Sequence, residues 1–383
     1  MTQYLFPERL LSETIEERKT YFKEYTAAHP AFEQAYNDLL DKIYNCTDNS
    51  VILVYGPTGA GKSKLIQKVN EKIYKDYLEQ LKQDPGMFST LMVEAIPPDS
   101  GNFDWKDFYY RALVEANEPA IDYKVNVEKY LSREKKVKED SRAILKRSLE
   151  NVLIYRKPKA FIIDEAQHIT LTTSARNLKN QVNIIKSLAN ITKVPIVLCG
   201  TYDILTFRDL QGQTIRRGRD THIKRYQAQN KDDLEAFINV LFAFQKHLPL
   251  QKEPDLVSHW DYFYSRTLGS VGTLKDWIYL TYSICLSNNP DLPSMEMDYF
   301  KKYEISAARA LKMLSEAKLG EKRVENTTNS EENKLYLELG LTEEEAYFAD
   351  KPAKKEIKKR NKLVGERNPR RDSVGVDELE EAQ

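Results

Sequence analysis

The sequence predicts an α/β fold in which a parallel sheet is sandwiched by helices and followed by a helical subdomain and a charged tail. Short apolar runs of strand length alternate with segments of helical periodicity between residues 51 and 200. A glycine-rich loop joins the first apolar run to the helix after it. Beyond residue 230 the strand pattern ends, whereas helical patterns continue to about residue 314. Because parallel strands need crossovers that cover the faces of their sheet, this alternation favours a parallel sheet buried on both sides.

Composition and charge exclude several classes of protein. The chain has 383 residues, enough for roughly two and a half domains. Lysine plus arginine number 58 and so do aspartate plus glutamate, so the net charge is zero and affinity for nucleic acid would need a local patch. The longest apolar run, 237–244, is far shorter than the roughly 18 residues of a membrane span. With three scattered cysteines and no secretion signal, we expect a cytoplasmic protein without a membrane partner.

The predicted elements follow one another in a regular order. An apolar stripe that begins at Pro30 and stops before Asn45 predicts a helix leading into the first strand. The predicted strands are 51–55, 91–96, 160–163 and 195–198. The predicted helices between the strands are 62–78, 104–112, 141–155 and 178–189. A lysine-rich polar stretch between the second and third strands is interpreted as an insertion.

These patterns divide the chain into four segments. Residues 1–45 are an N-terminal helical segment, 46–230 the α/β core, 231–318 a helical lid, and 319–383 a charged tail. The tail has too few apolar residues to form a core, so we expect disorder there. Its basic and acidic stretches suggest a hypothesis in which it docks a partner protein.

Residues 56–63 match the full pattern of a phosphate-binding P-loop and lie between an apolar strand and a helix, as that loop requires. Its glycines allow backbone N–H groups to approach a β-phosphate, and the helix N-terminus adds partial positive charge. We expect Lys62 to bridge the β- and γ-phosphates of ATP and the Ser63 hydroxyl to bind Mg²⁺. The predicted ATP-binding loop consists of Gly56, Pro57, Thr58, Gly59, Ala60, Gly61, Lys62 and Ser63.

A second apolar run ends in two acids, Asp164 and Glu165. In open α/β sheets ligands bind at the carboxyl ends of the strands, so these carboxylates should meet the loop. We expect Asp164 to reach Mg²⁺ through water and Glu165 to polarise the water that attacks the γ-phosphate. This pair favours hydrolysis over transfer to a bound alcohol.

Polar and basic residues after the next strand complete the predicted site. Thr201 can contact the γ-phosphate or the attacking water, although Gly-Thr is also a common strand-ending turn. Arg217 and Arg219 lie in a dense basic cluster, and in ring ATPases such an arginine stabilises the transition state in a neighbouring subunit. A phosphate-binding patch for nucleic acid and a solvated face are the alternatives for this cluster.

A lysine in the helical region is the last candidate ligand. Gly269 to Lys275 begin a helix, from which Lys275 can reach the bound phosphates as a second sensor. The alternative is an ordinary surface lysine at the start of a helix.

These motifs, in this order, resemble an AAA+ ATPase, and within that superfamily the chain looks like the transposition regulators of the TnsC and TniB type. Those regulators are related in role to the phage Mu B protein. The resemblance covers roughly residues 25 to 315. It rests on His29-Pro30-Ala31-Phe32, the loop Gly-Pro-Thr-Gly-Ala-Gly-Lys-Ser, Phe-Ile-Ile-Asp-Glu-Ala-Gln-His at 161–168, Cys199-Gly200-Thr201 and the Gly-x-x-Gly-x-Leu-Lys helix. The charged insertion and the tail after residue 320 depart from the family pattern.

The resemblance implies ATP-dependent assembly of a homo-oligomer, as rings or helical filaments, around double-stranded DNA. It further implies that the assembly marks a target and recruits or activates a transposase, together with a target-selector protein. Lysine and arginine side chains facing the phosphates would make DNA affinity steeply salt-dependent. The candidate DNA contacts, for each of which a solvated helix face is the alternative, are Lys106, Arg111, Lys124, Lys135, Lys136 and Lys138.

Three other functions fit parts of the pattern. An initiator or helicase-loader ATPase would have the same core and a different client. A helicase of the Asp-Glu-Ala-His type is suggested by 164–168, but the chain between Glu165 and Arg216 is too short for the second sheet domain of such enzymes. A nucleotide-gated scaffold, in which hydrolysis is only a timer, is the third.

Overall fold

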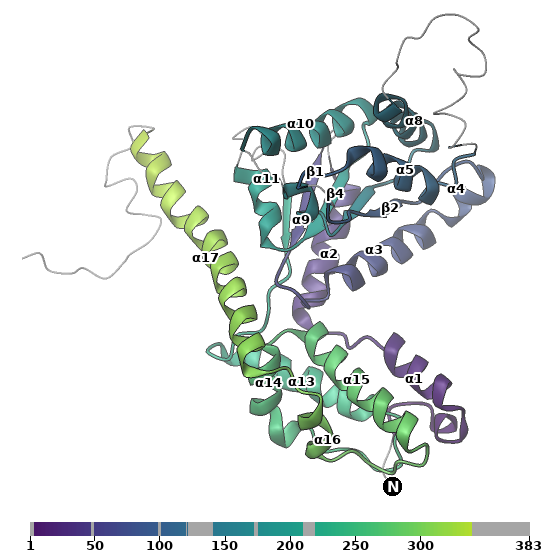
Figure 1. Cartoon of the computed structure of the whole chain (residues 1–383), viewed down its shortest axis with the longest axis vertical. Coiled ribbons are helices and arrows are strands. Elements are labelled where there is room, and N and C mark those ends of the chain that lie inside the picture. Colours follow the sequence, from purple (N-terminus) through teal and green to yellow (C-terminus); the bar gives the residue numbers. More distant parts are fainter. Residues whose placement is uncertain are drawn as a thin grey trace, which may run out of the picture. The chain divides into compact units, whose positions relative to one another are not determined.

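The computed structural model describes residues 4–46, 50–98, 101–119, 121, 141–171, 175–209 and 219–338, with the backbone alone for 175, 219 and 325–338. The chain divides into a unit that ends at Val324 and a second unit that begins at Glu325. The first unit contains a sheet with its flanking helices and a group of helices after it (Figure 1).

Five parallel strands form the sheet, in the order β2-β3-β4-β1-β5. The strands are β1 (Val51–Tyr55), β2 (Leu91–Glu94), β3 (Phe161–Asp164), β4 (Ile196–Gly200) and β5 (Arg219–His222). The predicted parallel sheet is therefore confirmed, and β4 lies between the loop strand β1 and the acidic strand β3. The sequence analysis missed β5, because its four residues Arg-Asp-Thr-His are polar and only backbone pairing with β1 identifies them as a strand.

Helices cover both faces of the sheet, as the apolar strands require. One face packs against α5 (Trp105–Glu115), α8 (Ser141–Arg156) and α10 (Ala175–Thr192). The opposite face packs against α2 (Pro30–Tyr44) and α3 (Lys62–Asp76). Because side chains alternate along a strand, Leu53 joins the first core, whereas Ile52 and Val54 join the second. Short elements connect these layers, namely α4 (Leu78–Gln83), α9 (Gln167–Thr170), the 3-10 helix η2 (Tyr202–Ile204) and α11 (Leu205–Asp209).

A separate aromatic core holds the helical lid together. Its elements are α13 (Lys231–His247), η3 (Val257–His259), α14 (Trp260–Thr267), α15 (Val271–Asn288) and α16 (Met297–Lys302). The N-terminal helix α1 (Ile15–Glu24), which follows the 3-10 helix η1 (Glu8–Ser12), also belongs here, because Phe22 is fully buried in this core. The Phe22 ring lies 6.0 Å from that of Phe244 and 5.8 Å from that of Tyr282, and Figure 1 shows α1 beside α15.

The predicted N-terminal segment 1–45 is therefore divided between two cores. Its first helix packs with the lid, and its second, α2, packs with the sheet. Between them, His29 is buried, and its Nδ1 forms a 2.8 Å hydrogen bond with the Tyr226 hydroxyl. This long-range packing is not visible in the local periodicity.

The last helix, α17 (Ala307–Glu338), is longer than the sequence predicts. We expected folding to stop at residue 318, but α17 continues through the first part of the predicted tail. Contacts explain part of the difference, since Glu321 and Arg323 form ion pairs with Arg225 and Asp209. The rest of the predicted tail, from residue 339, lies outside the described residues.

Two other findings concern composition. Cys46, Cys199 and Cys285 are free thiols. Within the described ranges, no helix combines the length and apolarity that crossing a bilayer demands.

Candidate nucleotide-binding site

The loop at 56–63 has the backbone geometry that a phosphate cradle needs. Gly59 and Gly61 adopt left-handed conformations, with φ of 77° and 91°. A β-carbon on Gly56 would collide with the carbonyl of Ile223, which follows β5. Gly61 is the N-cap of α3, so the N-terminal N–H groups of this 15-residue helix face the loop.

Lys62 lies within the loop that it is predicted to serve. Only 7% of the residue is exposed, and its Nζ donates hydrogen bonds to the carbonyl oxygens of Gly56 (3.2 Å) and Pro57 (2.9 Å). Burial lowers the pKa of the Lys62 ammonium, and the nearby Glu165 and Asp164 oppose that shift. The carbonyls of Gly56 and Pro57 thus accept the hydrogen bonds of the buried Lys62 ammonium, and phosphate oxygens can replace them as acceptors. Ser63, in the first turn of α3, is exposed.

The acidic pair ends β3 in two different environments. Asp164 is 6% exposed, and its Oδ1 accepts a 2.9 Å hydrogen bond from the Glu165 N–H. Glu165 has a φ of 51°, in the left-handed region that disfavours residues with a β-carbon. Strain of this kind, of order 1 kcal/mol or more, concentrates at functional sites because the surrounding structure must hold it. The backbone therefore turns sharply where the two carboxylates are presented.

Gln167 connects Glu165 to the next strand, and the sequence analysis did not identify it as a site residue. Its Nε2 donates to Glu165 Oε2, while its Oε1 accepts a 3.2 Å hydrogen bond from the Thr201 N–H. A β-carbon on Gly200 would collide with that Oε1, so the glycine makes room for the link. The sequence signal for Gln167 is its place in Asp-Glu-Ala-Gln-His, two residues after Glu165.

Thr201 lies at the edge of the sheet between the loop and the acids, because β4 separates β1 from β3. Its hydroxyl donates to Asp203 Oδ2 at 3.1 Å. Thr201 also lines a cavity of about 280 Å³ together with Pro57 and Thr58 of the loop. The structure thus places Thr201 and the start of the loop on one cavity.

The start of α15 packs directly on the loop. Thr273 N–H donates to the Gly59 carbonyl at 3.2 Å, and the Ser270 hydroxyl donates to the Thr58 carbonyl at 3.4 Å. A β-carbon on Gly272 would collide with the Gly59 carbonyl, so only glycine allows this approach. Ser270, Gly272 and Thr273 therefore lie against the loop, and none of them is among the site residues that the sequence predicts.

Lys275 has a different location from the expected one. Its Nζ donates to the carbonyl oxygens of Lys23 (2.7 Å) and Tyr25 (2.5 Å), at the C-terminal end of α1, rather than lying over the phosphate loop. A cation is favourable there because the carbonyl end of a helix carries partial negative charge. Burial and the charge of Lys64 lower the pKa of Lys275 to about 8.

The remaining candidates are only partly described. Arg217 lies outside the described residues, and Arg219 begins β5, where its backbone pairs with β1. Lys106 is exposed in the first turn of α5, and the exposed Arg111 pairs with Asp107 at 2.7 Å. The candidate DNA contacts outside the described residues are Lys124, Lys135, Lys136 and Lys138.

Comparison with known proteins identifies a domain within this chain. Residues 46–207 match a family model described as an AAA domain. No curated protein matches the sequence.

Solved structures with a similar arrangement include a Walker-type ATPase of Pyrococcus abyssi, with 14% identity, a TM-score of 0.42, and coverage of 78% of this chain and 76% of that one. The ORC2 protein of Aeropyrum pernix, in ADPNP and ADP complexes, has 13% identity, a TM-score of 0.43, and coverage of 78% and 71%. The ORC1 protein of Aeropyrum pernix, in complex with DNA, has 15% identity, a TM-score of 0.45, and coverage of 75% and 68%.

Proposed function

We propose that this chain, which has the AAA+ P-loop NTPase fold, binds Mg-ATP at the loop 56–63 and hydrolyses it. One observation carries the proposal. The loop, the buried Asp164 and the strained Glu165 lie at the same edge of one parallel sheet, and Gln167 links Glu165 to the strand between them. An AAA domain over residues 46–207 supports the same function.

The residues present fit a magnesium ion. The hydroxyl of the exposed Ser63 would bind the ion directly and the carboxylate of Asp164 would bind it through water, and both present the hard oxygen atoms that Mg²⁺ prefers. When bound, Mg²⁺ would neutralise charge on the β- and γ-phosphates.

The protein side chains divide the remaining work. The Lys62 ammonium exchanges the carbonyls of Gly56 and Pro57 for phosphate oxygens, which is favourable because an anionic acceptor replaces a neutral one. Glu165 orients the attacking water and accepts its proton, and Gln167 sets the direction of the carboxylate. Release of inorganic phosphate from Mg-ATP by the purified chain tests this proposal, and no release above the Glu165→Gln background would contradict it.

Hydrolysis in this proposal controls assembly on DNA. We infer that the chain forms rings or filaments on duplex DNA and regulates transposition by recruiting or activating a transposase at a selected target. The resemblance of its motifs to TnsC and TniB regulators supports this function. The segment Gly269 to Lys275, which contributes to that resemblance, packs on the phosphate loop through Gly272 and Thr273.

Imaging by negative stain, with duplex DNA and with or without Mg-ATP, tests the assembly. We expect ATP-dependent polymers on DNA, and monomers at saturating Mg-ATP would exclude this function. An initiator or helicase loader has the same core, so helicase-loading and unwinding assays separate that alternative from a transposition regulator.

A further inference from the structure

The cavity beside the phosphate loop has a wall that the proposed mechanism does not use. The loop contributes Pro57 and Thr58, and Thr201 lies across from them. The other walls come from the lid and from α17, which contributes Ala317 and Gly320 among others. Two arginines, Arg225 and Arg323, also line this space. Thr201 is the residue of this cavity that is predicted to contact the terminal phosphate, so we place the cavity on that side of the loop.

Arg225 is held close to the loop by its neighbours in the chain. It comes two residues after Ile223, whose carbonyl leaves no room for a β-carbon on Gly56. Its Nη1 donates to the Leu268 carbonyl at 3.3 Å, and Ser270, two residues further, contacts Thr58. Arg225 therefore lines the same cavity as Thr58 of the P-loop and Ser270, the residue directly before α15.

A carboxylate from α17 forms an ion pair with this guanidinium. Arg225 Nε donates to Glu321 Oε1 at 2.7 Å, and Nη2 donates to Oε2 at 2.9 Å. The two side chains are 9% and 14% exposed. Paired, parallel hydrogen bonds of this form are how arginine binds both carboxylates and phosphates. Glu321 thus presents to Arg225 the same pair of acceptor oxygens that a phosphate would present.

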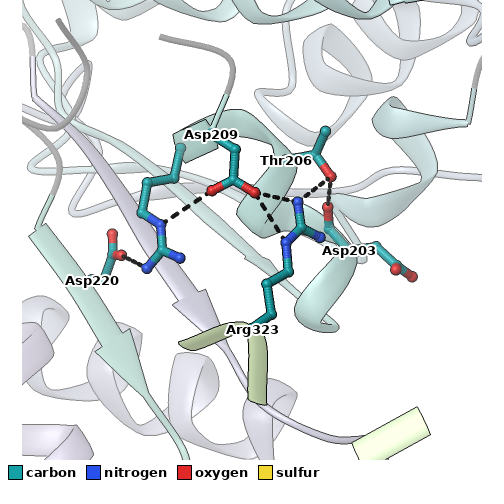
Figure 2. Close-up of polar contacts among 6 residues, drawn as sticks. Asp203, Thr206, Asp209, Asp220 and Arg323 are labelled. Carbon is teal, nitrogen blue, oxygen red and sulfur yellow. Dashed lines mark hydrogen bonds and ion pairs between the residues drawn. The ribbon is translucent and has the colours of Figure 1, made fainter. Parts of the chain in front are cut away.

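Contacts on either side fix Glu321 in place. A β-carbon on Gly320 would collide with the Tyr202 ring, so α17 packs closely on the residue after Thr201. Arg323 donates from Nε to Asp209 Oδ2 at 3.0 Å and from Nη2 to the Thr206 hydroxyl at 3.3 Å (Figure 2). The segment 320–323 therefore packs on residues 202–209, which follow β4.

We propose that Arg225 is an additional ligand of the terminal phosphate of ATP, and that Glu321 of α17 takes the place of this phosphate when it is absent. The inference rests on the proposed ATPase function. ATP exchanges the carboxylate on Arg225 for a phosphate and loosens α17, whereas ADP leaves the ion pair intact. Either anion satisfies the guanidinium, because an unpaired cation this buried would be costly.

Calorimetric titration of the full chain with Mg-ADP and with the Mg complex of a non-hydrolysable ATP analogue tests the exchange. Glu321→Gln should tighten the analogue about tenfold relative to ADP, because the competing charge is removed. Arg225→Gln should weaken the analogue about tenfold and change ADP little. In the double variant the gain from Glu321→Gln should disappear. Glu304→Gln, which breaks the comparable Arg266 pair within the lid, is the matched control and should leave the ratio unchanged.

Hydrogen exchange on the unmodified chain provides a second measurement that needs no variant to fold. Amides of residues 316–324 should exchange faster with the ATP analogue than with ADP. Equal exchange rates in the two complexes would overturn the inference. So would a ratio of analogue affinity to ADP affinity that changes by less than twofold in both Glu321→Gln and Arg225→Gln. Either result would leave the ATPase proposal standing. A chain that binds neither nucleotide would overturn the proposed function itself.

Discussion

Lys62 shows how one side chain is prepared for an anion before the anion arrives. It is buried and hydrogen-bonded to the carbonyls of Gly56 and Pro57, so its charge is satisfied within the loop. Neutral carbonyls stabilise an ammonium less than phosphate oxygens do, and the difference favours nucleotide binding.

We expect Lys62→Ala to weaken binding of Mg-ATP about a hundredfold or more, because several charge-assisted hydrogen bonds are lost together. Binding of a fluorescent ATP analogue measures the effect. Lys68→Ala is the matched control, because this lysine is on the same helix and pairs at the surface with Glu71. Equal losses in the two variants would show that Lys62 has no special part.

Glu165→Gln should retain ATP and reduce its hydrolysis by roughly 10² to 10⁴, the contribution typical of a positioned general base. The amide keeps the shape of the side chain and removes its basicity. Phosphate release under single-turnover conditions measures the chemical step, and binding is measured separately. Glu71→Gln on the surface of α3 serves as the control. A parental rate in Glu165→Gln would assign the base to another residue.

At the scale of elements, periodicity predicts the strands β1 to β4 and the helices of both layers to within a few residues. Buried strands in a parallel sheet are continuous apolar runs, so they are visible in a single sequence. β5 is not visible in this way, because its residues are polar and form a strand only through backbone pairing with β1. The pairing of Arg225 with Glu321, 96 residues apart, has no local signal either.

The contact between α15 and the loop gives a prediction at this scale. Gly272→Ala places a methyl group against the Gly59 carbonyl and should push the two elements apart. We expect a loss of about 1–3 kcal/mol in stability, as for other overpacked contacts, together with weaker nucleotide binding. Thermal unfolding with and without Mg-ATP measures both effects. Gly86→Ala is the control, because its β-carbon would meet only the flexible side chain of Asp84 at 3.1 Å. Unchanged binding in Gly272→Ala would separate the lid contact from the site.

At the scale of the whole molecule, two buried histidines should make stability depend on pH. Burial lowers the pKa of His29 and of His222 to about 4, from 6.5. Protons therefore bind the unfolded chain preferentially. The contribution of the two buried neutral imidazoles to the free energy of unfolding is complete above pH 6.5 and is lost as the pH falls towards 4. His29→Gln keeps a hydrogen-bonding group near Tyr226 without titrating. We expect it to reduce the pH slope of denaturant-unfolding stability between pH 6.5 and 4 by roughly half, because His222 still contributes the rest, and an unchanged slope would contradict this account.

The extent of the folded chain predicts the effect of truncation. Ending the chain at residue 338 retains Glu321 and Arg323, so ATP hydrolysis should remain within about twofold while transposase recruitment is lost. Ending it at residue 318 also removes the ion pairs to Arg225 and Asp209 and should lower the melting temperature. Phosphate release, thermal unfolding and co-precipitation with the transposase measure the three properties. Recruitment that survives without residues 339–383 would place the docking site elsewhere.

The packing of α1 with the lid has a mechanical consequence. Because α1 precedes α2 in the chain while α13 follows β5, two separate backbone segments, 25–29 and 223–230, join the lid to the sheet. A body attached at one point can rotate in any direction. Once α17 is released from Tyr202 and Asp209, the two backbone attachments leave mainly rotation about the line through them. The hydrogen bond between His29 and Tyr226 joins these two segments, so the two residues lie on the expected rotation axis. Any opening of the lid would then follow one repeatable path.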